Sequence, residues 1–270
     1  MGKSAITIMI PIFFAAIGGL FPALCGSLNI ALEGLLLIGA FSSLTVYYFT
    51  GSVTIAVLAA IIAAITLALI HAFTTFKLSA NIFISGLAIN LLSSGLCILF
   101  SDKIYKTKGV IAVNDIPALN KWYILMGLVL IIISWLAIYK TPFGYRLRAC
   151  DKNATALVSL GIKPKFYQTT ALLISGFFCG IGGSFLSLNL GAYVPGMSAG
   201  KGWIALAVIF LGMRTPIGIM AAAFIFAFAE SFSNYAQGFL SIPTDFILAI
   251  PYIFTLLVII LISIIPKNTT

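Results

Sequence analysis

Long apolar runs recur along this chain of 270 residues, and most of them can cross a membrane as a helix. About 20 apolar residues span the roughly 30 Å of hydrocarbon in a bilayer, because a helix rises about 1.5 Å per residue. Only 8% of the residues are charged and 61% are hydrophobic, which argues against a soluble helical protein. The ten-residue alternation of a membrane barrel is absent from the sequence. We therefore expect an all-α, polytopic helical membrane protein with a single transmembrane domain, 1–270.

Two of the apolar runs are interrupted, so we expect discontinuous helices. Pro22 and Gly26 break the chain before the second span, and a glycine-rich loop precedes a short apolar segment that starts at Trp203. Backbone freed within a membrane must be satisfied by protein or by a water-filled cavity, as in transporters and channels. The N-terminal run has no small-x-small cleavage site and is expected to be a first span. The expected spans are 4–20, 29–49, 53–76, 81–100, 122–139, 167–187, the pair 203–213 and 217–234, and 246–265.

The longest charged interruption is the loop 140–166, which we expect to be cytoplasmic because it is the most basic. Counting spans from it places the N-terminus outside, together with the lysine-bearing loop 101–121. Within the basic loop, Asn153 is expected to cap a short helix that ends at Gly161. The apolar side of this helix would consist of Ala154, Leu157 and Val158.

Polar residues inside the spans are candidates for a solute pathway, because a buried charge in a membrane is costly. Asn29 and Glu33 are four residues apart and are expected on one helical face. Glu33 either borders a pathway or hydrogen-bonds backbone at a helix start, where the helix dipole favours an acid. The other candidates form interhelical hydrogen bonds or contact solute. They are Ser85, Asn90, Glu230 and Asn234.

Other classes of chemistry find little support in the sequence. No cluster with metal-ligand spacing and no nucleophile–base pair is present, so we expect no metal, no cofactor and no catalytic residue. The segment GMSAGKG at 196–202 lacks the first glycine and the final Ser or Thr of a phosphate-binding loop. The net charge of +9 lies mostly in loops, where orientation and anionic lipid explain it without nucleic acid. ATP hydrolysis, if it drives this protein, would require another subunit.

Five segments in this order resemble one known family. They are GSLNIALEGLLLIGAF (26–41), ISGLAINLLSSGL (84–96), RLRACDKNATALVSLGI (146–162), GFFCGIGGSFLSL (176–188) and GKGWIALAVIFLGMRTPIG (200–218). Together they resemble the inner-membrane permeases of ABC importers for branched-chain amino acids, simple sugars and nucleosides. Within the family, the chain is most similar to the shorter of two permeases in the purine-nucleoside branch. Ala23-Leu24-Cys25 stands where family members commonly carry an acidic-basic pair.

The resemblance implies a type II importer fold in the inner membrane of a bacterium, with a pathway between two permeases. Arg148–Ile162 matches the helix that docks on a cytoplasmic ABC ATPase. The implied partners are that ATPase, a second permease, a lipoprotein receptor of the basic-membrane-protein type and membrane lipid. The implied substrate is a purine nucleoside; the alternatives are ribose or galactose, then a branched-chain amino acid. A rival class is a self-sufficient secondary transporter or channel. The implied ATPase-coupling residues are Arg146, Arg148, Asp151, Lys152, Asn153, Leu157 and Gly161.

Overall fold

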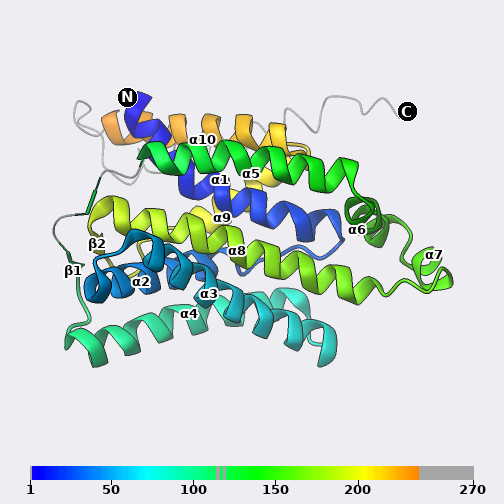
Figure 1. The fold of residues 1–270 in the computed structure, drawn as a ribbon, viewed down its shortest axis with the longest axis horizontal. Helices are drawn as coiled ribbons and strands as arrows, with labels where there is room; N and C mark the ends of the chain where they lie inside the picture. Colours follow the sequence, from blue (N-terminus) through cyan, green and yellow to red (C-terminus); the bar gives the residue numbers. More distant parts are fainter. Residues whose placement is uncertain (1, 114–115, 118–119, 237–270) are drawn as a thin grey trace.

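The computed structural model describes residues 2–113, 116–117 and 120–236 as an elongated bundle whose long helices run along one axis (Figure 1). Seven of the described helices are long and apolar enough to cross a membrane, and a shorter apolar helix accompanies them. This confirms the expected all-α polytopic architecture. The expected span 246–265 lies outside the described residues. The helices are α1 (Gly2–Leu24), α2 (Leu32–Thr50), α3 (Val53–Ala72) with a π-helical turn (Phe73–Lys77), α4 (Ile82–Tyr105), α5 (Asn120–Lys140), α6 (Pro142–Lys152), α7 (Ala154–Ser159), α8 (Pro164–Leu190), α9 (Lys201–Leu211) and α10 (Pro216–Ala236).

Helix α8 is the packing centre of the bundle and contacts α1, α2 and α3. Glycines allow close packing here, and they lie on two sides of the helix. Gly180 lies against the backbone of Ile61 in α3, whereas a side chain at Gly183 would overlap the carbonyl oxygen of Leu36 in α2. Small residues allow helix backbones to approach closely in a membrane, where apolar side chains gain little from leaving lipid. Helix α8 therefore joins two neighbours through two glycine faces.

The first interruption lies later than the sequence indicated. Helix α1 continues through Pro22 to Leu24, and the chain then runs as an irregular connector, 25–31. Figure 1 shows this connector turning back from one end of the bundle before α2 begins. Helix α2 starts beside Asn90, which lies eight residues, or about 12 Å, beyond the start of α4. The first turn of α2 is therefore inside the helical layer.

The second interruption is the loop 191–200, which precedes α9. Helix α9 has only 11 residues, about 16 Å, and cannot cross a bilayer alone. A turn at 212–215 then reverses the chain into α10, as the expected paired segments indicated. The discontinuous helices expected from the sequence are thus present at α2 and α9.

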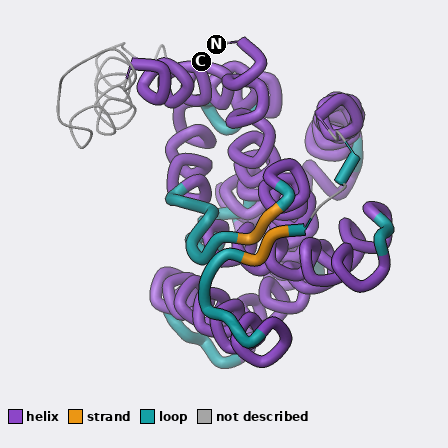
Figure 2. The backbone as a smooth tube through the Cα atoms, turned by 90° about the vertical axis from the view of Figure 1, so that its left-hand side faces the viewer, coloured by secondary structure: helices purple, strands orange, loops and turns teal. Residues whose placement is uncertain are grey.

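Two short strands that the sequence did not predict lie at the opposite end of the bundle from α6 and α7 (Figure 1). Strand β1 (Ile111–Ala112) pairs antiparallel with β2 (Ala192–Tyr193), with Ile111 opposite Tyr193. Figure 2 shows the pair from its own end of the bundle, with the helices behind it. The pair links the loop after α4 to the loop that leads into α9.

The basic loop 140–166 holds two helices, where the sequence predicted one. Pro142 occupies the first turn of α6, and the Thr141 hydroxyl accepts a hydrogen bond from the Gly144 N–H, which is a regular helix start. Asn153 precedes α7 as expected, but its side chain makes no capping hydrogen bond there. Gly161 has a φ of +74°, so the expected glycine stop after this helix is confirmed.

Candidate functional site

Glu33 connects the two interrupted helices. Its Oε1 accepts a hydrogen bond from the Gly200 N–H at 2.8 Å, and its Oε2 accepts one from the Gly202 N–H at 2.7 Å. These N–H groups belong to the start of α9, where no earlier helical carbonyl is available to them. Glu33 itself lies in the first turn of α2. One carboxylate therefore stabilises the positive ends of two helix dipoles inside the layer. We call this contact the Glu33 junction.

The backbone around the junction is suited to this close approach. A side chain at Gly202 would overlap the backbone of Glu33, and Gly200 has a φ of +80°, a conformation that glycine adopts without strain. Both positions therefore require glycine. From the sequence this segment was expected to be a glycine-rich loop that interrupts a helix, but its contact with Glu33 was not predicted. Its glycine density was the one signal available.

The start of α2 is held by two asparagines. Asn90 Oδ1 accepts a hydrogen bond from the Gly34 N–H at 2.8 Å, and Asn90 Nδ2 donates to the Ile30 carbonyl at 3.0 Å. Asn29 precedes α2, so the expectation that it shares a helical face with Glu33 is wrong. Its amide donates to Ser175 Oγ on α8 at 2.8 Å, and its Oδ1 accepts from the Ala31 N–H. The geometry brings Asn29, Glu33 and Asn90 together around one helix start.

Asn90→Ala is expected to destabilise the protein by roughly 1–3 kcal/mol, because the Gly34 N–H loses its acceptor in a site shielded from water. The measurement is the thermal unfolding midpoint in detergent. Ser94→Ala, one turn further along α4, is the control and should leave the midpoint nearly unchanged. Equal midpoints for the two variants would contradict a capping role for Asn90.

Glu230 approaches the junction from α10. Its Oε1 lies 3.6 Å from Lys201 Nζ, and Lys201 stands between the two glycines bound by Glu33. Its Oε2 is buried and has no hydrogen-bond partner among the described residues. A partly buried ion pair in a membrane protein is a candidate element of a solute pathway. Asn234 is exposed one turn further along α10.

Ser85 belongs to a separate cluster. Its hydroxyl shares hydrogen bonds with His71 Nδ1 at 2.9 Å and with Thr74 Oγ1 at 2.6 Å. His71 is fully buried, and its Nε2 has no partner in the described part of the chain. The cluster joins the end of α3 to the start of α4. Ser85 and Asn90 were both expected as candidates for a solute pathway, and their side-chain contacts lie apart in the structure.

The basic residues of α6 are largely engaged within the chain. The Arg148 guanidinium lies over the rings of Tyr139 and Tyr145, at 5.0 and 5.1 Å from their centres. Arg146 Nη1 donates to the Tyr167 hydroxyl at 3.1 Å, while Lys152 is exposed. These contacts fix α6 against α5 and α8.

Helix α7 presents a different surface. Leu157 is buried and anchors the helix, whereas Val158 is 62% exposed and Leu160, directly after the helix, is 75% exposed. Of the expected apolar side formed by Ala154, Leu157 and Val158, Leu157 alone is buried against the described part of the bundle. Asp151 forms an ion pair of 3.5 Å with Arg214 in the turn between α9 and α10, and both side chains are partly exposed. An ion pair of this kind contributes at most about 1 kcal/mol.

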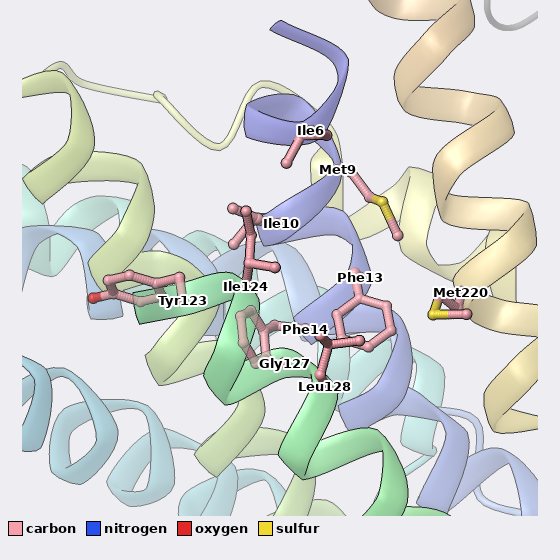
Figure 3. A pocket seen from close by; sticks show the side chains of 10 residues that line it. All are labelled: Ile6, Met9, Ile10, Phe13, Phe14, Tyr123, Ile124, Gly127, Leu128 and Met220. Atoms are coloured by element: carbon pink, nitrogen blue, oxygen red, sulfur yellow. The ribbon is translucent and has the colours of Figure 1, made fainter. Parts of the chain in front are cut away.

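A cavity of about 180 Å³ lies between α1, α5 and α10 (Figure 3). Its lining includes Met9, Phe13, Leu128 and Met220, and the one polar atom that Figure 3 displays, the Tyr123 hydroxyl, is hydrogen-bonded to Ser184. A polar solute would lose its hydrogen bonds to water here without replacement. This cavity is therefore a poor candidate for contact with a polar solute.

Interrupted helices joined inside the layer, with a polar two-helix loop at one end, are an arrangement found in membrane transporters and channels. The chain belongs to the family described as branched-chain amino acid transport system / permease component, which matches residues 3–263. Together with the seven apolar helices, this membership makes it a multi-pass protein of the bacterial inner membrane. No solved structure matched the chain.

Three relatives illustrate the similarity. The guanosine ABC transporter permease protein NupQ of Bacillus subtilis is 34% identical, covering 92% of this chain and 86% of NupQ. The nucleoside ABC transporter permease protein NupC of Lactococcus lactis is 31% identical, covering 92% of this chain and 87% of NupC. A second Bacillus subtilis protein, the guanosine ABC transporter permease protein NupP, is 34% identical over 37% of this chain and 29% of its own length.

Proposed function

We propose that this chain is a permease subunit of an ABC importer and forms part of the translocation pathway for a purine nucleoside. The observation that carries the proposal is the similarity to NupQ and NupC over 92% of the chain. The chain itself would be non-catalytic, and a separate ATPase would drive transport. Ribose or galactose remains the alternative cargo, and a channel or secondary transporter the alternative class.

The Glu33 junction would border the pathway. Two helix ends and the Lys201–Glu230 pair meet there inside the layer, which supplies polar groups where hydrogen bonds to a polar solute are needed. Asn29 and Asn90 would hold the junction in place, since their side chains are occupied by neighbouring groups. Asn234, one turn beyond Glu230 on α10, would lie further along the same route, whereas Ser85 is occupied in the separate cluster with His71 and Thr74.

The partners follow from the same proposal. NupQ and NupP are two permease proteins of one organism, and both resemble this chain, which favours a second, related permease beside it. An ATPase would bind on the cytoplasmic side, and a lipoprotein receptor would deliver solute from outside. We place α6 and α7 on the cytoplasmic side because their loop is the most basic in the chain.

The ATPase would dock on α7 through its exposed apolar residues. Val158 and Leu160 face away from the bundle, and hydrophobic surface of this kind outside the membrane is a common sign of a protein partner. Leu157 anchors the helix, and the contacts of Arg146 and Arg148 hold α6 rigid beneath it. Lys152 is free to meet an acidic group of the partner.

Val158→Asp combined with Leu160→Asp is expected to abolish capture of the ATPase and to lower uptake at least about tenfold, because a charge would be buried in the interface. The fold should persist, since neither side chain is packed. The measurements are co-purification of the ATPase and uptake by cells. Val110→Asp is the control, because Val110 is 59% exposed at the opposite end of the bundle. Normal co-purification and uptake in the double variant would remove the docking claim.

Uptake of radiolabelled guanosine by cells carrying the full importer tests the substrate. Guanosine and inosine should compete with the label, whereas ribose, galactose and leucine should not. Competition by a sugar alone would move the assignment to the sugar branch. Guanosine flux through the purified chain in liposomes, without ATPase, would overturn the importer class.

A further inference from the structure

Two cysteines that the proposed function leaves unused meet where the α1–α2 connector touches α6. Cys25 is the first residue of the connector and Cys150 lies near the end of α6. Cys25 is fully buried and Cys150 is 5% exposed, and the two side chains are neighbours. No local pattern pairs them, because 124 residues of chain, including Cys97, lie between the two cysteines.

The neighbouring residues confirm that the two segments are in close contact here. A Cβ at Gly26 would lie 3.3 Å from the Asp151 Cα and 2.9 Å from Asp151 Oδ1. Residues 25–26 and 150–151 thus lie side by side, so the sulfurs can meet without a large movement of the backbone. A disulfide requires this proximity, since its two Cα atoms must come within about 7 Å.

We propose that Cys25 and Cys150 form a redox-sensitive pair whose oxidation to a disulfide locks α6 to the α1–α2 connector and stops transport. The part that concerns transport rests on the proposed function. Helix α6 continues into α7, while the connector leads directly to Asn29 and the Glu33 junction. A covalent bond between them would prevent the ATPase-docking loop from moving relative to the start of α2.

The oxidant would be a small disulfide. The Cys150 thiolate attacks one of its sulfurs, forming a mixed disulfide and releasing one small thiolate. The Cys25 thiolate then attacks the Cys150 sulfur, the second small thiolate leaves, and the Cys25–Cys150 bond forms. The protein sulfurs lose two electrons and two protons, which leave in the two small thiols. The reverse exchange with excess small thiol reopens the bond.

Burial slows the oxidation of the pair. Burial raises the pKa of both the Cys25 and the Cys150 thiols above their ordinary value, so little reactive thiolate exists at neutral pH. Brief exposure to the oxidant would leave both thiols free, and sustained exposure would form the disulfide. Cys97 and Cys179 lie within α4 and α8, away from α6, and serve as internal controls.

The first experiment maps disulfides in isolated membranes that hold the full chain. After incubation with oxidised glutathione and alkylation of free thiols, mass spectrometry should find the Cys25–Cys150 cross-linked peptide in the wild type and in Cys179→Ala. It should be absent in Cys25→Ala and in Cys150→Ala. Absence of the peptide from the wild type after prolonged incubation would overturn the pair, whatever the protein transports.

The second experiment measures nucleoside uptake in cells treated with diamide, which converts small thiols to disulfides. Uptake by the wild type should fall at least about fivefold and return after dithiothreitol. The variants Cys25→Ala and Cys150→Ala should keep the rate that they show without diamide. An equal loss in Cys150→Ala, or full uptake by protein whose cross-link is mapped, would overturn the lock. Absence of uptake by untreated wild type would count against the proposed function and leave the mapped disulfide standing.

Discussion

Glu33→Ala is expected to lower nucleoside uptake at least about tenfold, with a loss of stability of roughly 1–3 kcal/mol for each N–H that loses its acceptor. The carboxylate is the shared partner of the Gly200 and Gly202 N–H groups, and it is the one anion between the starts of α2 and α9 in the described structure. Without it, two positive helix ends face each other where water is scarce. The measurements are uptake per unit of membrane-inserted protein and the unfolding midpoint in detergent.

Two companion variants sharpen the Glu33 experiment. Glu33→Gln keeps one acceptor oxygen and removes the charge, so its uptake and midpoint should lie between those of the wild type and Glu33→Ala. Asp102→Ala removes an exposed acid at the end of the bundle that carries the β1–β2 pair, and should change neither quantity. Wild-type uptake together with a wild-type midpoint in Glu33→Ala would mean that the junction is dispensable.

Gly183→Val is expected to prevent stable insertion of the chain. A Cβ at this position overlaps the Leu36 carbonyl oxygen and would lie 2.8 Å from the Ala40 nitrogen, so α8 and α2 would have to separate. Relief by backbone movement costs roughly 3 kcal/mol or more where two helices are this close, which is a large part of the stability of a typical domain. Immunoblotting of membranes and size-exclusion chromatography in detergent should show little monodisperse protein.

The control for Gly183 lies on α4. A Cβ at Gly95 meets no heavy atom within 4 Å, so Gly95→Val adds the same side chain without a clash. It should accumulate to nearly the wild-type amount. If both valine variants accumulate equally, the close approach of α8 and α2 is not what limits assembly.

The membrane architecture could be predicted from the sequence because hydropathy alone sets which segments cross a bilayer. The expected spans between residues 4 and 234 coincide with helices of the structure to within a few residues. Helix α6 was missed because its polar, amphipathic sequence was interpreted as loop. The β1–β2 pair was missed because two-residue strands have no periodicity to detect.

The candidate site could be predicted only as a set of residue types. A carboxylate within an apolar run requires polar partners, because a buried charge in a membrane is costly. Both alternatives for Glu33, a place beside a solute pathway and a hydrogen bond to backbone at a helix start, include such partners. Its partners lie 167 and 169 residues away, and Asn90 reaches back across 56 residues to Gly34. Such pairings depend on how the helices pack, which no local pattern encodes. The same holds for the meeting of Cys25 with Cys150.

Helix α8 connects the two ends of the protein without interruption. It starts three residues after Gly161 and ends beside β2, and its 27 residues extend about 40 Å, some 10 Å more than the hydrocarbon thickness. A rod of this length tilted by about 5° displaces its far end by roughly 3.5 Å. A tilt of this size about Pro164 would therefore move Gly191 by more than the length of a hydrogen bond. Gly191 begins the segment that leads into α9.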